Sequence, residues 1–183
     1  MKYPLVLLGA LLMATAPTAF AQDTKKIVLG FENGLEDFTG DVEQDATVGK
    51  TGSGSAKMVA ELADVETNAW TTAKRSLDLP GKIQSLSFWL KSADANSITV
   101  RIVDSTGQVH QSRPGFVPSD DWQEIRIEAF DTGRRYQHFE GANDGQVHWP
   151  ATTLAFIIEK GALLSGNGTI WIDDVEIVPE NAQ

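Results

Sequence analysis

Short runs of alternating apolar and polar residues recur along the chain, and turn-forming residues separate them. In the segment 83–91, Leu86, Phe88 and Leu90 occupy every second position, and Trp89 lies on the opposite side. The segment 97–103 repeats this pattern, with Arg101 on its polar side. An alternation of period two indicates a β-strand that buries one face. These segments therefore predict strands that cover a core.

The whole chain follows the same pattern, without heptads and without a long amphipathic helix. We expect strands at 26–32, 56–62, 69–79, 83–91, 97–103, 108–112, 122–129, 153–159 and 169–178. Asp104 to Gly107 forms a hairpin turn between two of them. Eight or nine short strands with polar connections predict an all-β fold, a β-sandwich. The longest irregular segment, 131–152, is long enough to serve a function.

The final predicted strand, GTIWIDDVEIV (168–178), contains two adjacent acidic residues. Strict alternation places Ile172 and Val175 on opposite faces of this strand. A β-bulge at Asp173 and Asp174 would return both apolar residues to the core side. If the first and last strands pair, Glu32 comes close to Asp173. Such a cluster of oxygen ligands suits Ca²⁺, although acids at a strand end are often only solvated.

The N-terminal segment predicts export. Residues 1–21 contain a basic start, an apolar run and the small-x-small sequence Ala19-Phe20-Ala21, which together indicate a secretory signal peptide. We expect a secreted or periplasmic protein in which 22–183 form a single β-sandwich domain, a length of about 160 residues that supports one core. The chain has no cysteine, so packing or a metal must hold this exported fold.

Charge and motifs exclude several functions. The formal net charge of −10 argues against nucleic acid and against polyanion binding through bulk charge. No segment after the signal peptide is apolar enough for membrane insertion. The sequence has no phosphate-binding loop, and the scattered acids do not suggest the paired carboxylates of a glycosidase. We therefore expect no enzyme activity.

The mature segment resembles a jelly-roll carbohydrate-binding module of the galactose-binding-like group, of the family 11 type. The resemblance rests on the order of several motifs. These are Gly30-Phe31-Glu32, the turn and strand GKTGSGSAKMVAEL, the strand Leu86 to Ser92, the hairpin ITVRIVDSTGQ, Asp121 to Ile125, and Gly168 to Val175. The resemblance implies a fold in which two sheets form a jelly roll.

The resemblance also implies a structural Ca²⁺ between the first and last strands. Glu32 and Asp173 would be side-chain ligands, and Lys57 would contribute its backbone carbonyl. Asp174 replaces Asp173 if the bulge is placed differently. In this family the ion stabilises the fold and takes no part in catalysis.

Sugar binding on one sheet face is the function that the resemblance implies. Aromatic rings stack on the apolar faces of sugars, and planar polar groups bind the hydroxyls. Trp89 and Arg101 point away from the core, and we expect them on adjacent strands. The candidate carbohydrate-binding residues are Trp70, Trp89, Arg101, His110, Gln111, Arg113, Tyr136 and Trp149. The partner would be a polysaccharide or oligosaccharide. The protein would bind it alone or beside a separate glycoside hydrolase or cell-surface protein.

Two alternatives remain open from the residues. The sandwich could be a structural or protein-binding domain, because the tryptophans and Arg101 also fit packing and ion-pair roles. A small polysaccharide lyase is the other alternative. Arg101 and Gln111 would then neutralise a uronate, and His110 and Tyr136 would serve as base and acid.

Overall fold

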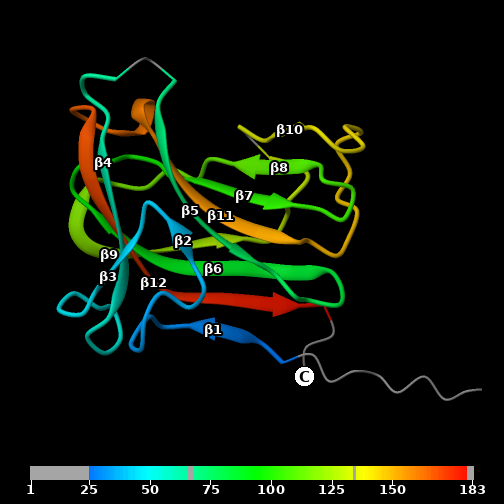
Figure 1. The fold of residues 1–183 in the computed structure, drawn as a ribbon, viewed down its shortest axis with the longest axis horizontal. Coiled ribbons are helices and arrows are strands. Elements are labelled where there is room, and N and C mark those ends of the chain that lie inside the picture. The colour runs from blue at the N-terminus through cyan, green and yellow to red at the C-terminus, as the bar shows by residue number, and fades with distance from the viewer. Residues whose placement is uncertain (1–24, 66–67, 134, 181–183) are drawn as a thin grey trace, which may run out of the picture.

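The computed structural model describes residues 25–65, 68–133 and 135–180. In these residues, twelve strands form two six-stranded antiparallel sheets, and one short 3₁₀ helix, η1 (Lys160–Ala162), follows β11. The sheets pack face to face as a β-sandwich (Figure 1). The all-β, jelly-roll prediction is confirmed. The predicted signal peptide, residues 1–21, lies outside the described residues.

The first sheet contains the longest strand at its centre. Its strands are β1 (Ile27–Leu29), β3 (Glu43–Asp45), β4 (Ser55–Glu61), β6 (Ile83–Ser92), β9 (Ser119–Ile127) and β12 (Asn167–Pro179). They follow the order β3-β4-β12-β6-β9, and β1 pairs with the C-terminal part of β12. β12 therefore has β6 along one side, and first β4 and then β1 along the other.

The second sheet carries the outer face on which the site is built. Its strands are β2 (Thr39–Gly40), β5 (Trp70–Ser76), β7 (Thr99–Val103), β8 (Val109–Ser112), β10 (Gln137–Phe139) and β11 (Thr153–Glu159). They follow the order β10-β8-β7-β11-β5-β2. Figure 1 shows β10 and β8 at one margin of the fold and β1 at the other.

The core fills the space between the two inner faces. Phe88 on β6 and Phe156 on β11 are fully buried, and their rings meet edge to face with centroids 4.9 Å apart. Leu86 and Leu90 flank Phe88 on the same side of β6 and are equally buried. The alternation predicted for β6 is confirmed. Burial of one side chain of this size contributes roughly 1.5–3 kcal/mol to folding.

The predicted bulge in the last strand is present. The register between β12 and β6 shifts between Asp173 and Glu176, and Asp174 has a positive φ of 46°. As a result Ile172 and Val175 are both buried in the core. The pairing of first and last strands is also confirmed, because Leu29 lies opposite Val175.

Three strands were missing from the sequence prediction. β2 and β3 are two and three residues long, and β10 lies inside the segment 131–152 that we expected to be irregular. None of these three strands has an alternation of apolar residues in its sequence. They are strands only because their backbones pair with a neighbouring strand, and the sequence pattern does not show this. The first predicted strand also ends earlier, at Leu29. Among the described residues, no helix has the length and hydropathy needed to cross a membrane.

Candidate functional site

A row of side chains crosses the outer face of the second sheet. Residues that are paired in register on neighbouring strands share a face. From β10 to β2 the row contains Gln137, Gln111, Arg101, Ala155, Lys74 and Thr39. A parallel row places Glu159 on β11 beside Trp70 on β5. The face therefore combines planar polar groups with one large aromatic ring.

A hydrogen-bond network connects the polar groups. Arg101 donates through Nε and Nη2 to Oε1 of Gln111, at 3.1 and 2.8 Å. Gln111 donates to Oε1 of Gln137 at 3.0 Å, and Arg113 donates to the same oxygen at 2.8 Å. Arg113 also binds the carboxylate of Glu159 with distances of 2.9 to 3.1 Å. These mutual contacts fix the orientation of each planar group before any ligand arrives.

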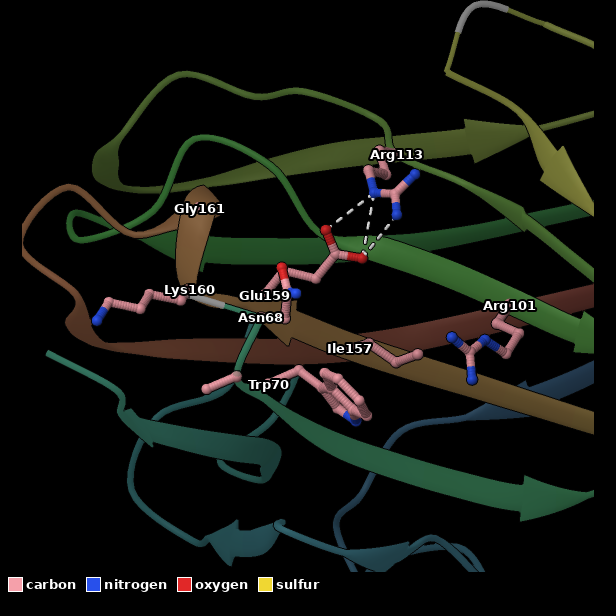
Figure 2. Close-up of a pocket in the computed structure, with 9 residues that line it drawn as sticks. Asn68, Trp70, Arg101, Arg113, Ile157, Glu159, Lys160 and Gly161 are labelled. Carbon is pink, nitrogen blue, oxygen red and sulfur yellow. Dashed lines mark hydrogen bonds and ion pairs between the residues drawn. The ribbon is translucent and has the colours of Figure 1, made fainter. Parts of the chain in front are cut away.

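Trp70 forms the wall of a pocket next to this network. The pocket has a volume of about 390 Å³, and the residues that line it include Trp70, Arg101, Arg113, Ile157 and Glu159. Trp70 is 60% exposed, although it is the largest kind of side chain. Figure 2 shows its indole beside Ile157 on β11, with the Arg113–Glu159 pair on the far side of the pocket. An exposed ring beside fixed polar groups is a typical saccharide-binding arrangement.

A second hollow of about 700 Å³ continues across β5 and β2. Lys74, Thr72 and Thr153 are among the residues that line it, and Arg101 lines both hollows. Ala155 is paired with Arg101 and has a small side chain, so the outer face is hollow at this position. The two hollows together make an extended open surface with Arg101 at their junction.

The expectation that Trp89 and Arg101 lie on adjacent strands was wrong. Trp89 is on β6 in the first sheet, whereas Arg101 is on β7 in the second. Both point away from the core, so they lie on opposite outer faces of the sandwich. Alternation correctly predicted which way each side chain points, but it contains no information about which sheet a strand joins. Trp89 is instead covered by Lys50, whose Nζ lies 4.2 Å from the ring centroid.

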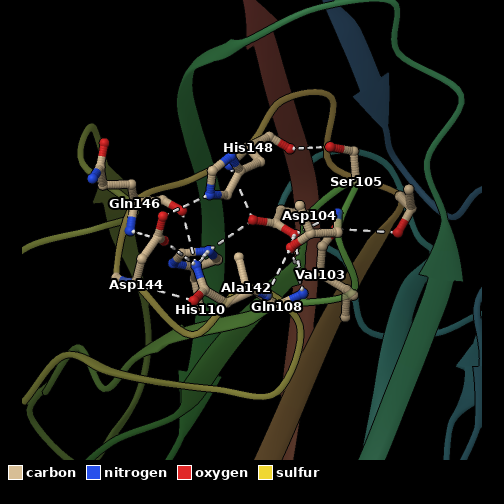
Figure 3. Close-up of polar contacts among 12 residues, drawn as sticks. Val103, Asp104, Ser105, Gln108, His110, Ala142, Asp144, Gln146 and His148 are labelled. Carbon is tan, nitrogen blue, oxygen red and sulfur yellow. Dashed lines mark hydrogen bonds and ion pairs between the residues drawn. The ribbon is translucent and has the colours of Figure 1, made fainter.

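His110 and Tyr136 lie in a buried polar cluster rather than on the open face. His110 is paired with Ile102, on the side of β8 opposite to Gln111, and is only 1% exposed. Its Nδ1 lies 2.7 Å from the hydroxyl of Tyr136. Its Nε2 lies 3.2 Å from Oδ2 of Asp104 (Figure 3). His110 and Gln111 are consecutive residues of one strand, so they could not share a face.

Asp104 is the centre of this cluster. Its Oδ1 accepts hydrogen bonds from the backbone amides of Thr106 and Gln108, and its Oδ2 accepts one from the amide of His148. Burial raises the pKa of Asp104, but the hydrogen bonds from His148, Thr106 and His110 outweigh it and hold the pKa well below its ordinary value. The cluster thus joins the turn after β7 to the segment 140–148 (Figure 3).

Trp149 anchors the end of the long connection. Its indole packs edge to face on Phe130, with ring centroids 5.8 Å apart, and it lies against the hydrophobic core. It lines neither of the two hollows described above. Of the eight candidate residues, Trp70, Arg101, Gln111 and Arg113 therefore come together on one face, whereas Trp89, His110, Tyr136 and Trp149 lie elsewhere.

Three residues of this face were not singled out from the sequence. Glu159 and Ile157 are on the outward side of β11, and Gln137 comes from the unexpected strand β10. Ile157 and Glu159 are two residues apart on a predicted strand and therefore share a face, a signal that the sequence contained. Gln137 had no such signal, because its strand contains no apolar pattern.

The predicted metal ligands surround a different part of the fold, the turn 49–54. Glu32 accepts hydrogen bonds from the amides of Ser53 and Gly54 at 3.0 to 3.2 Å. Asp173, with no exposed surface, accepts from the amides of Lys50 and Thr51 at 2.6 and 3.3 Å. The two carboxylates thus hold the same turn, which agrees with the pairing of the first and last strands.

Of the other two predicted ligands, Asp174 contacts the same turn, and the Lys57 side chain binds a residue of β3. Asp174 lies at this turn and accepts a hydrogen bond of 2.6 Å from the hydroxyl of Thr51. Lys57 lies within β4, paired on both sides, and its Nζ binds Glu43 at 2.8 Å. The ammonium group of Lys57 is therefore engaged with β3, and the role predicted for its backbone carbonyl stays a prediction. In the part of the chain that the structure describes, no group of three or more His, Cys, Asp or Glu residues is arranged to hold a metal ion.

Comparisons with solved structures place the fold among carbohydrate-binding modules. The family 11 carbohydrate-binding module from Clostridium thermocellum, solved with a β-1,3-1,4-mixed-linked tetrasaccharide, is 17% identical with a TM-score of 0.58, over 84% of this chain and 95% of that one. A family 27 module with specific mannan recognition is 8% identical with a TM-score of 0.51, over 86% and 100%.

The same fold occurs in an adhesin. The K1 cleaved adhesin domain of Lys-gingipain from Porphyromonas gingivalis is 15% identical with a TM-score of 0.53, over 86% of this chain and 100% of that one. No protein-family model matches the chain. A search of curated proteins finds no match either. At these identities the likeness shows the jelly-roll fold, and the residues of this chain must decide the function.

Proposed function

We propose that this protein is a non-catalytic carbohydrate-binding domain that holds a polysaccharide or oligosaccharide on the outer face of the second sheet. One observation supports this most directly: Trp70, 60% exposed, stands beside the linked planar groups of Arg101, Gln111, Arg113 and Glu159. A sugar ring on the indole would place its hydroxyls within reach of these groups. The known ligands of the similar modules agree with this assignment.

The geometry disfavours the lyase alternative. A lyase would need a base and an acid close to the groups that neutralise the uronate. His110 and Tyr136 hydrogen-bond to each other inside the buried cluster, on the side of β8 opposite to Gln111. They therefore do not reach a sugar bound at Arg101.

The test is binding to a panel of polysaccharides, measured by affinity electrophoresis and calorimetry. We expect Trp70→Ala to abolish binding, because the ring provides the stacking surface. Trp89→Ala is the matched control, since Trp89 lies on the opposite outer face, and it should bind as the wild type does. If Trp89→Ala alone lost binding, the site would belong to the first sheet.

The same binding test decides between carbohydrate binding and a protein-binding sandwich. The same fold is found in an adhesin domain, so the fold does not decide between the two functions. A protein that bound none of the polysaccharides in the panel would refute the carbohydrate proposal. A protein partner of the same face would then be the next hypothesis to test.

We propose separately that the turn 49–54 binds Ca²⁺. The donors fit this hard cation in kind, because Glu32, Asp173 and Asp174 all contact the turn, and the buried hydroxyl of Ser55 beside it has no hydrogen-bond partner. Burial raises the pKa of Asp173, and a bound cation would keep that carboxylate ionised. Binding would require the turn to replace its amides with carbonyl oxygens.

The calcium proposal is tested by melting temperature with Ca²⁺ or EDTA, together with terbium luminescence as a direct readout. We expect Ca²⁺ to raise the melting temperature of the wild type and not that of Glu32→Gln. Glu61→Gln, far along β4, is the control. Identical melting temperatures with Ca²⁺ and EDTA, and no terbium signal, would contradict it.

We also propose that the chain is exported and that residues 1–21 are removed. The support is the sequence pattern of this segment. N-terminal sequencing of the protein from its native host should begin at Gln22. Recovery of the intact chain from the cytoplasm would contradict export.

A further inference from the structure

Arg101 stands at the junction of the two hollows with a neutral partner only. Its guanidinium donates twice to the amide oxygen of Gln111 and lies over the ring of Phe139, 5.4 Å from the centroid. Within residues 25–65, 68–133 and 135–180, no carboxylate lies within 4.0 Å of it. Arginines in partly buried positions are usually paired with an acid, so this one is unusual.

Two of the acidic groups on this face have partners other than Arg101. The carboxylate of Glu159 is bound by Arg113 and accepts a further hydrogen bond from Thr99. Asp41 accepts a hydrogen bond from the backbone amide of Thr72. Figure 2 shows the Arg101 side chain extending beside Ile157, apart from the Arg113–Glu159 pair. Arg101 therefore forms no direct ion pair with these acids, and Glu159 and Glu140 act on its charge only from a greater distance.

Arg101 also keeps hydrogen-bonding capacity. Its Nε and Nη2 are used, whereas its Nη1 has no partner among the described residues and is not among the buried unsatisfied atoms. Burial lowers the pKa of Arg101 from its ordinary value, although Glu159 and Glu140 act in the opposite direction. An arginine remains charged even so. A half-buried cation with open donors is a binding site for an anion.

We propose that Arg101 binds an acidic group of the glycan, a uronate carboxylate or a sulfate ester, so that the ligand is an acidic polysaccharide. This inference rests on the proposed carbohydrate-binding function and narrows its substrate class. Trp70 stacks one sugar ring in the first hollow, and the anionic group of a nearby ring meets the guanidinium at the junction. The second hollow then receives the continuing chain.

The local charge agrees with an acidic ligand although the whole chain is acidic. Five basic and three acidic residues line the two hollows: Lys74, Arg75, Arg101, Arg113, Lys160, Asp37, Asp41 and Glu159. The formal net charge of the whole chain is −10. The negative charge therefore lies mainly elsewhere, which would orient a polyanion toward this face.

The experiment compares acidic polysaccharides with neutral derivatives of the same backbone. Polygalacturonate is paired with its fully methyl-esterified form, and carrageenan with a chemically desulfated sample. Binding of the full chain is measured by calorimetry at low and high NaCl concentration. Neutral β-glucan and mannan test sugar binding that requires no charge.

We expect the protein to bind one acidic polymer at least tenfold more tightly than its neutral derivative, and the preference to weaken with NaCl. Arg101→Gln should remove that preference, and Arg101→Lys should retain part of it. Lys91→Gln, which removes one positive charge from the other sheet, is the matched control and should keep it. The polymer that shows the preference distinguishes a carboxylate from a sulfate.

The outcomes separate the two proposals. Equal binding of acidic and neutral polymers, or binding of neutral glucan that Arg101→Gln leaves unchanged, would overturn the acidic-ligand inference and preserve carbohydrate binding. If Lys91→Gln also lost the preference for the acidic polymer, that preference would come from the overall charge of the protein. This result would overturn the inference as well. Failure to bind any polymer would refute both. Circular dichroism and melting temperature confirm that each variant is folded.

Discussion

The side chain of Asp104 accepts a hydrogen bond of 3.0 Å from the backbone amide of His148, 44 residues further along the chain. The same carboxylate binds the turn of its own hairpin through Thr106 and Gln108. One buried acid therefore fixes two segments at the margin of the second sheet. This margin includes β10, whose Gln137 belongs to the network on the open face.

The stability contributed by Asp104 should depend on pH. The folded state holds its pKa below the ordinary value, so the unfolded chain takes up the proton more readily. The contribution is complete above about pH 4, the unfolded pKa, and is lost as the pH falls toward the folded pKa. We expect Asp104→Asn to destabilise the protein by about 2 kcal/mol at pH 7 and to flatten the acid limb of stability against pH.

Urea unfolding between pH 2 and pH 7 measures this effect. Asp120→Asn is a suitable control, because Asp120 is exposed and its side chain forms no hydrogen bond within the described residues. An acid limb of unchanged slope in Asp104→Asn would show that other carboxylates account for the acid sensitivity.

Gly52 should be intolerant of a side chain. It has a positive φ of 71°, and an added Cβ would lie 2.3 Å from Oε1 of Glu32. We expect Gly52→Ala to destabilise the protein by about 1–3 kcal/mol. Gly81→Ala provides the comparison, since no atom lies within 4 Å of its Cβ position. Chemical denaturation of both variants tests this, and equal stabilities would disprove a tightly fixed turn.

Trp149 and Trp70 should respond in opposite ways to truncation. Trp149 packs on Phe130 and the core, so Trp149→Ala should cost about 2 kcal/mol of stability and leave sugar affinity intact. Trp70 is exposed, so Trp70→Ala should change stability little and remove binding. Melting curves and calorimetry on both variants decide this. A Trp149→Ala protein that is fully stable but unable to bind would move the site to the long connection.

The contact between the two sheets depends on Phe156. It is 1% exposed and touches both Phe38 and Phe88 through its ring. We expect Phe156→Ala to destabilise the fold by about 3–5 kcal/mol, because the other sheet cannot move in to fill the cavity. Val117→Ala, at a residue 69% exposed, should be close to neutral. Urea unfolding gives both values, and a loss below 1 kcal/mol for Phe156→Ala would indicate that the core repacks.

Much of the fold could be predicted because strands leave a local signal. The alternation along β6 and β7 requires only that one face of the strand is buried, so the sequence alone indicates on which face each residue lies. The slip at Asp173 and Asp174 predicted the bulge in the same way, since Ile172 and Val175 must both enter the core. These features depend on neighbours in sequence.

The membership of the two sheets was decided by tertiary structure alone. Trp89 and Arg101 have the same local pattern, and only the pairing of β6 with β12 and of β7 with β11 places them on opposite faces. Likewise Gln137 joins the site because β10 pairs with β8, although its strand has no apolar alternation. The sequence by itself determined which side of each strand meets the core. The tertiary structure determined which outward residues meet one another, because that depends on hydrogen bonds between strands far apart in the chain.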